Sequence, residues 1–242
     1  MRIIRSGGTV LIFNKQMSKH HKDNLQETQS PLASSGKFMQ ENAKSLAVIG
    51  GAILALILLY FGYQKFYLAP RAEKAANEMF RAEQYAASDS LADKAIKGDG
   101  SYPGFEVIAD EYSNTKSANI ANAYLGGLYL KKGEFQKAAD ALGEYSSTGS
   151  PVIDPLVLGM LGDAYSELKD YRQAITYYKK ASDKSKNTFT SPLYLKKLGL
   201  VYEEQKEFKA AEDAYQKIKT DYPESNEASV IDSYIARVQA RQ

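Results

Sequence analysis

One long apolar stretch interrupts an otherwise polar chain. Residues 45–64, SLAVIGGAILALILLYFGYQ, contain no charged side chain and are bounded by Lys44 and Lys65. At a rise of 1.5 Å per residue, about 20 helical residues span roughly 30 Å, the thickness of the hydrocarbon core of a bilayer. A core helix of a soluble protein normally keeps a polar stripe, and this stretch has none. The pattern predicts a single transmembrane helix over residues 45–65.

The predicted helix is expected to remain uncleaved. A secretory signal lies at the extreme N-terminus and has a shorter apolar region followed by a small-residue cleavage site. Here the apolar stretch begins after residue 44, and the sequence QKFYLAPRAEK at its end offers no such site. Amphipathic aromatic rings favour the headgroup region, and five crowd this end: Tyr60, Phe61, Tyr63, Phe66 and Tyr67.

Small side chains recur every four residues along the same helix, at Ala43, Ala47, Gly51 and Ala55. Positions four apart share one face of a helix. In lipid, small residues allow two helix backbones to approach closely. The stripe is a hypothesis for a transmembrane packing seam. The alternative is a plain tether, because Ala and Gly are common in membrane helices.

Residues 1–44 are predicted to form a disordered cytoplasmic tail, since residues 17–36 are polar and lack apolar periodicity. Residues 1–16 are more apolar and are a start-site extension if translation begins at Met17; the sequence leaves Met1 and Met17 both open. His20 and His21, the two histidines of the chain, are expected to be solvated in this tail and not to bind metal.

A short repeated phrase occurs three times after the apolar stretch. It consists of Leu-Gly, a Tyr three residues after the glycine, an aromatic residue six residues after that Tyr, and an Ala three residues later. The glycines are Gly126, Gly162 and Gly199, so the periods are 36 and 37 residues. This phrase resembles the tetratricopeptide repeat, a helix-turn-helix unit of about 34 residues. The glycine would let the second helix approach the first, whose packing face carries Leu125 and Tyr129 in the first repeat.

The predicted fold class is therefore all-α: a single N-terminal transmembrane helix followed by a tetratricopeptide-repeat α-solenoid. Residues 66–100 are expected to form a membrane-proximal helix. Residues 101–242 are expected to form the repeat domain, with a further helix over 105–112 and a C-terminal capping helix, because stacked repeats need caps.

The concave wall of such a solenoid comes from fixed positions of each first helix, and these mix small, apolar and acidic residues. That mixture suits an extended peptide or a partner helix, and the alternative is a merely solvated wall. A clamp for a C-terminal carboxylate is disfavoured, because Lys131 and Lys196 are joined by no asparagine. The predicted groove residues are Ala123, Gly127, Leu130, Lys131, Gly159, Asp163, Ser166, Glu167, Lys196, Leu200, Glu203 and Glu204.

Composition argues against several functional classes. The net charge is +2, which does not suggest a nucleic-acid partner. The chain has no cysteine, which excludes thiol catalysis and thiolate metal sites. It shows no catalytic triad, metal cluster or phosphate-binding loop, and the Asp-Gly pair at 99–100 lacks the alternating ligands of a calcium loop. We therefore expect a non-enzymatic protein with no cofactor and no small-molecule substrate.

Two segments carry a resemblance to a more specific family. FMQENAKSLAV, residues 38–48, and FEVIADEYSNTKSANIANAYLGGLYLKKGEFQKAADAL, residues 105–142, resemble the YfgM-like ancillary subunits of the bacterial Sec translocon. The resemblance implies a single-pass inner-membrane protein with a cytoplasmic N-terminus and a periplasmic repeat domain. It implies two partners, the SecYEG channel and a membrane-anchored periplasmic chaperone of the prolyl-isomerase type. Charges flanking the span are balanced and do not set its orientation.

Two functions are therefore expected from the sequence. The first is an accessory subunit of the Sec translocon that binds a chaperone partner, emerging secreted proteins, or both. The second is an inner-membrane-anchored envelope scaffold that assembles another complex through its repeats.

Overall fold

The computed structural model describes residues 42–242, which form helices and no strand. The predictions for the tail up to residue 41, including Met17, His20 and His21, lie outside the described residues. By their internal contacts the residues form two units that divide between Gln64 and Lys65. An apolar helix followed by helical repeats confirms the predicted all-α fold class.

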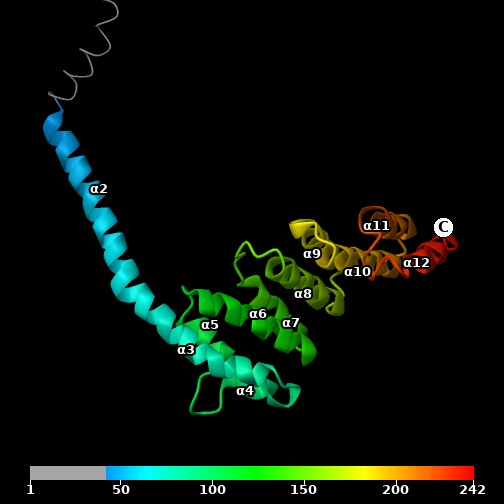
Figure 1. The fold of residues 1–242 in the computed structure, drawn as a ribbon, viewed down its shortest axis with the longest axis horizontal. Helices are drawn as coiled ribbons and strands as arrows, with labels where there is room; N and C mark the ends of the chain where they lie inside the picture. The colour runs from blue at the N-terminus through cyan, green and yellow to red at the C-terminus, as the bar shows by residue number, and fades with distance from the viewer. Residues whose placement is uncertain (1–41) are drawn as a thin grey trace, which may run out of the picture. The chain divides into compact units, whose positions relative to one another are not determined.

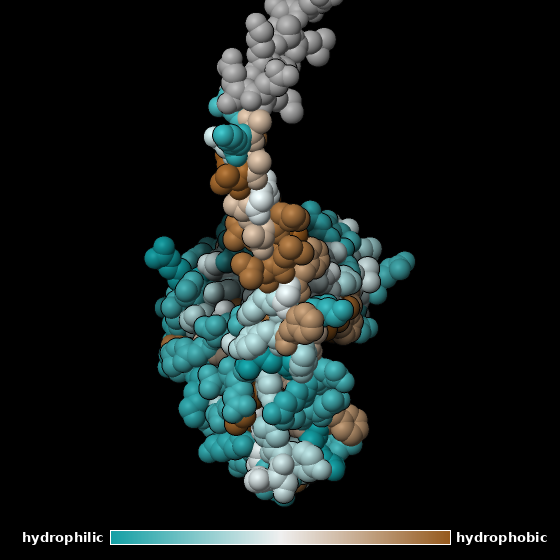
Figure 2. All heavy atoms as spheres, turned by 90° about the vertical axis from the view of Figure 1, so that its left-hand side faces the viewer, coloured by the Kyte–Doolittle hydropathy of each residue, from teal (hydrophilic) through white to brown (hydrophobic). Residues whose placement is uncertain are grey.

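The first unit contains helix α2, Ala43–Tyr63. By length and composition α2 can cross a membrane, and none of its residues is buried. Figure 2 shows its apolar side chains in brown, whereas the second unit presents a mainly hydrophilic surface in the same view. The seam residues Ala43, Ala47, Gly51 and Ala55 all lie on α2, and a Cβ built on Gly51 would meet no atom within 4 Å.

The membrane-proximal segment is not the single helix expected over residues 66–100. The short π-helix η1, Gln64–Leu68, leads into α3, Ala69–Ala86. The chain then turns at the 3-10 helix η2, Asp89–Leu91. The next helix, α4, Ala92–Lys97, folds back onto α3. The break begins at Ser88, whose backbone is extended, in the sequence Ser-Asp-Ser. These side chains compete with the helix for backbone hydrogen bonds and favour turns.

The second unit continues as a row of helical hairpins (Figure 1). Helix α5, Phe105–Glu111, lies within the further helix expected over 105–112, and it packs on α6. The hairpins are α6, Lys116–Lys131, with α7, Phe135–Gly143; α8, Ile153–Glu167, with α9, Tyr171–Ser185; and α10, Thr190–Glu204, with α11, Phe208–Asp221. Helix α12, Ile231–Gln239, packs on α11 and ends the row.

The glycine of each repeat is where its two helices touch. A Cβ built on Gly126 would lie 2.2 Å from Cγ of Leu142 on α7. The same test places a Cβ on Gly199 2.2 Å from Cε1 of Tyr215 on α11, and Gly162 meets Tyr178 on α9 in the same way. The three partner side chains are buried. The close approach predicted from the repeated phrase is therefore confirmed.

The turn inside each hairpin also repeats. Seven residues after the repeat glycine, the backbone enters the left-handed region, with φ of 74° at Gly133 and 60° at both Lys169 and Lys206. This conformation ends a helix in the way that glycine allows without strain. A lysine in the same conformation costs about 1–2 kcal/mol.

Buried side chains form one large cluster mainly from α3 to α7 and another mainly from α9 to α12. Between them lies a small cluster of Leu142, Val157 and Leu161. The junction of the first and second repeats is therefore the place where the apolar core is thinnest.

Candidate binding groove

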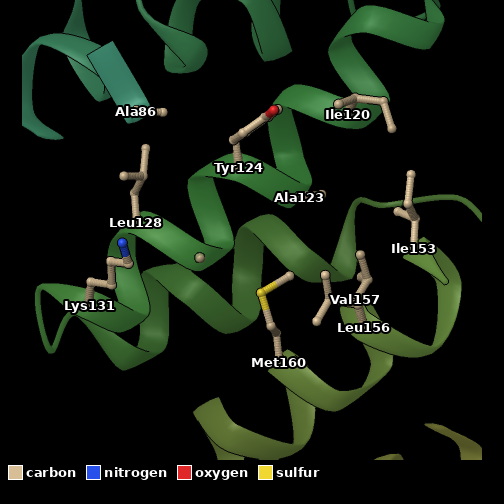
Figure 3. Close-up of a pocket in the computed structure, with 11 residues that line it drawn as sticks. Ala86, Ile120, Ala123, Tyr124, Leu128, Lys131, Ile153, Leu156, Val157 and Met160 are labelled. Carbon is tan, nitrogen blue, oxygen red and sulfur yellow. The ribbon is translucent and has the colours of Figure 1, made fainter. Parts of the chain in front are cut away.

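An apolar groove of about 410 Å³ opens between the C-terminal end of α3, the exposed face of α6 and the N-terminal half of α8 (Figure 3). In Figure 3 the side chains of Leu156, Val157 and Met160 point from α8 toward α6. Large apolar groups are exposed here, since Leu156 is 44% and Ile153 38% accessible to solvent. The lining consists of Ala86, Ile120, Ala123, Tyr124, Gly127, Leu128, Lys131, Ile153, Leu156, Val157 and Met160.

The groove exists because neighbouring repeats pack differently. Between the second and third repeats, the ring of Tyr194 on α10 covers Gly159 on α8, where a Cβ would come within 1.9 Å of Cε1 of the ring. By the repeat periods, the corresponding residues between the first and second repeats are Val157 and Ala123. Valine is much smaller than tyrosine, so the space beside Ala123 stays open. We therefore call this space the α6–α8 groove.

A buried carboxylate fixes the wall of the groove at the start of α8. The Asp154 side chain is 2% exposed and accepts hydrogen bonds from Tyr145 Oη at 2.8 Å, Ser147 Oγ at 2.5 Å, Thr148 N at 2.9 Å and Gly149 N at 2.9 Å. Burial alone would raise the pKa of Asp154, but these hydrogen bonds outweigh it and hold that pKa well below its ordinary value. The loop before α8 is thereby held in one conformation.

The predicted groove residues divide among several places. Ala123, Gly127 and Lys131 line the α6–α8 groove. A neighbouring hollow includes Leu130, Asp163, Ser166 and Glu167, and another includes Ser166, Glu167, Leu200 and Glu204.

Three predicted residues do not form an open wall. Gly159 is buried beneath Tyr194, because a glycine is needed where that ring passes. Glu203 accepts a hydrogen bond from Tyr215 and pairs with Arg237 at 2.6 Å, which leaves its side chain 9% exposed. Lys196 Nζ lies 4.0 Å from Glu227. These placements correct the prediction for Gly159 and Glu203, whose surfaces are already occupied within the chain.

The sequence analysis missed the large apolar residues of the lining. Ile120 and Tyr124 stand six and two residues before Gly126, and Leu156 and Met160 stand at the same offsets before Gly162. Helical side chains tilt toward the N-terminus of their helix, so the open face of α6 and α8 begins earlier than the predicted set. The recurrence of large apolar residues at these two offsets is the signal that could have found them.

Charges around this face are unequally paired. Three of its lysines face carboxylates: Lys131 Nζ lies 2.9 Å from Asp89 and Lys197 Nζ lies 2.6 Å from Asp163, while Lys196 faces Glu227. A fourth, Lys169, lines the hollow of Leu200 and Glu204 and forms no ion pair within the described residues. In residues 42–242, by contrast, no ion pair involves Glu83, Glu167 or Glu204. Glu83 lies close enough to Tyr124 that its charge, after the larger effect of burial, raises the pKa of that tyrosine. Three unpaired carboxylates against one unpaired lysine leave the free charge of this face negative.

The described residues include no group of three or more His, Cys, Asp or Glu side chains that could hold a metal ion. What the groove offers instead is an apolar surface, and the unpaired carboxylates Glu83, Glu167 and Glu204 lie outside its lining. Such a surface can bind an amphipathic group, and no set of side chains on it is arranged for bond making or breaking.

Comparison with known proteins agrees with the repeat fold. The family model described as tetratricopeptide repeat matches residues 160–226, which include most of the second and third hairpins. No curated protein matches the chain. Among solved structures, the crystal structure of BtubC (BKLC) from P. vanneervenii is similar with a TM-score of 0.40 and 14% sequence identity, covering 72% of this chain and 66% of that one. At that TM-score the similarity carries no conclusion about function.

Proposed function

We propose that this protein is a membrane-anchored, non-enzymatic adaptor that docks a segment of a partner protein in the α6–α8 groove. The observation that carries the proposal is the exposed apolar lining, above all Leu156 and Ile153 on α8. Exposed apolar patches on a folded unit mark interaction sites, and tetratricopeptide repeats imply protein partners. Helix α2, which is long and apolar enough to span a bilayer, would hold the groove at a membrane.

In its finer form, the proposed adaptor is an accessory subunit of the Sec translocon. Its partners would be the SecYEG channel and a membrane-anchored periplasmic chaperone of the prolyl-isomerase type. The resemblance of residues 38–48 and 105–142 to YfgM-like subunits supports this form, together with the position of α2 before the repeats. The chain would then cross the inner membrane once, with a cytoplasmic N-terminus and periplasmic repeats.

The second candidate is an envelope scaffold that assembles a different complex. The same groove favours it equally, because an apolar surface does not identify the complex to which its partner belongs. The two candidates differ in which proteins co-purify with the chain.

The test closes the groove with a contact that the protein already uses elsewhere. Combining Ala123→Gly with Val157→Tyr copies the Gly159 and Tyr194 packing into the junction of the first two repeats. Val107→Tyr on α5 is the matched control, because Val107 is 36% exposed and does not line the groove. The full-length chain is purified in mild detergent, and co-purifying proteins are quantified by mass spectrometry.

We expect SecYEG to accompany the wild type and the Val107→Tyr control, and to be lost from the groove-closing variant. That variant should keep the wild-type helix content, although Ala123→Gly inside α6 lowers its stability by about 0.5–1 kcal/mol. Loss of a different complex would select the scaffold. Partners that remain at wild-type levels on the closed groove would refute docking in it. Independently, protease added to intact spheroplasts should digest the repeats; protection until lysis would reverse the orientation.

A further inference from the structure

The occupant that the α6–α8 groove fits best follows from two unpaired carboxylates, Glu167 and Glu204, which lie in a separate hollow at the C-terminal end of α8 and which we call the acidic border. We infer that the groove takes a basic amphipathic protein segment, in which large apolar side chains enter the groove and Lys or Arg side chains lie against Glu167 and Glu204. This inference rests on the proposed function and adds the chemistry of the partner to it.

Charge complementarity disfavours the opposite type of partner. An acidic segment or a C-terminal carboxylate needs an available cation, but Lys131, Lys196 and Lys197 each already face a carboxylate of this chain. Lys169 forms no ion pair within the described residues, but two carboxylates, Glu167 and Glu204, line the same hollow and outnumber it. Glu167 and Glu204 are exposed, line the same hollow and form no ion pair within the described residues. A basic side chain can therefore pair with them without breaking an existing contact.

The geometry of α8 places the apolar and acidic parts on one face. Leu156, Met160 and Glu167 stand at i, i+4 and i+11, which at 3.6 residues per turn lie above one another. The rise of 1.5 Å per residue puts Glu167 about 10 Å from Met160 and about 16 Å from Leu156 along the axis. A partner helix lying parallel to α8 would therefore carry its basic residues two to three turns after its apolar ones.

The probe is a synthetic fluorescent peptide with this spacing. It is a helix-forming peptide with leucines on one face and two lysines two to three turns further along the same face. Two counterparts carry glutamine or glutamate in place of the lysines. Binding is measured by fluorescence anisotropy on the full-length protein in nanodiscs of uncharged phosphatidylcholine, with empty nanodiscs as the background.

The protein variants separate charge from apolar contact. Glu167→Gln with Glu204→Gln neutralises the border, and Glu144→Gln with Glu224→Gln is the matched control, because those two carboxylates are exposed and line no part of the groove. The lysine peptide should bind most tightly and the glutamate peptide least. Exposed ion pairs contribute about 0.3–1 kcal/mol each, so neutralising the border should weaken the lysine peptide roughly 3- to 30-fold.

The control variant should leave this affinity unchanged, and the glutamine peptide should bind wild type and border variant alike. Higher salt should weaken the lysine peptide more than the glutamine peptide. Equal affinity of the three peptides, or a lysine peptide indifferent to border neutralisation, would overturn the basic-segment inference.

Failure of the inference and failure of the proposed function give different results. If the glutamine or glutamate peptide binds best, and the groove-closing pair Ala123→Gly and Val157→Tyr still abolishes binding, docking in the groove stands and its basic preference falls. If closing the groove leaves all binding intact, the groove is not the site and both fall. If no peptide binds, the basic preference falls, and the co-purification experiment decides docking separately.

Discussion

Two adjacent glycines on α6 provide a direct test of how the repeats pack. Gly126 faces α7, and Gly127 faces the groove. A Cβ on Gly126 would lie 2.2 Å from Cγ, 2.3 Å from Cδ2 and 2.9 Å from Cδ1 of Leu142. A Cβ on Gly127 would meet Sδ of Met160 at 3.6 Å, which is ordinary van der Waals contact. We therefore predict opposite effects of Gly126→Ala and Gly127→Ala on stability.

The magnitudes follow from two opposing contributions. Replacing a helical glycine by alanine stabilises a protein by about 0.5–1 kcal/mol, because the unfolded chain loses conformational freedom. Gly127→Ala should gain this amount. At Gly126 the added methyl group must displace Leu142, whose side chain is buried and 1% exposed. Overpacking of this kind costs about 1–3 kcal/mol, and so severe an overlap favours the upper end, which leaves a net loss of about 2 kcal/mol.

The assay is thermal unfolding of the full-length protein in detergent, followed by circular dichroism at a helical wavelength. For a unit of this size, 1 kcal/mol shifts the Tm by about 2–4 °C. Gly126→Ala should lower the Tm by about 4–8 °C, and Gly127→Ala should raise it by about 1–4 °C. A Gly126→Ala variant that melts at or above the wild-type temperature, or equal shifts of both variants, would show that α6 and α7 do not touch at this glycine.

Three further predictions concern other parts of the chain. Lys169→Gly and Lys206→Gly should each stabilise the repeats by about 0.5–1 kcal/mol in the same thermal assay, because glycine removes the strain of the left-handed turn; a lower Tm would contradict the turn geometry. Asp154→Ala should cost about 1–3 kcal/mol by leaving buried donors unpaired. Because the pKa of Asp154 is depressed in the folded state, its stabilisation should be complete above pH ~4 and decline as the pH falls further; a Tm difference between wild type and Asp154→Ala that does not shrink in acid would contradict this. Gly51→Ile combined with Ala47→Leu should release partner proteins from the membrane complex while the chain stays inserted, if the stripe on α2 is a packing seam; unchanged cross-linking would leave α2 a tether.

The repeat core was predictable because each contact is recorded in residue types at fixed spacing. A glycine such as Gly162 and a large side chain such as Tyr178 specify each other, since only glycine admits the ring. The break after α3 was missed because the apolar pattern of a helix continues on both sides of Ser88. The chain reverses direction there because Ser88 and its neighbours favour a turn, and because the reversal buries Ala95 and Ile96.

The groove itself could not be placed from one repeat. Its open face depends on how far successive hairpins rotate, and this depends on which side chain fills each junction. The difference between Val157 and Tyr194 is small in sequence but determines whether a space remains. Comparing the residues at equivalent positions of the two junctions between repeats, in addition to comparing the repeats themselves, would have indicated which junction is open.

The thin core at that junction has a mechanical consequence. Within each repeat, an aromatic or leucine side chain seated on glycine resists relative motion of the two helices, and Tyr194 seated on Gly159 does the same between the second and third repeats. The first and second repeats are joined by the smaller contacts of Leu142, Val157 and Leu161. We expect the row of hairpins to bend most easily at this junction. The first and second repeats would then move as two rigid bodies, and the distance between α6 and α8 would change. The groove would then be an adjustable gap, whose width responds to load on either end of the repeat unit.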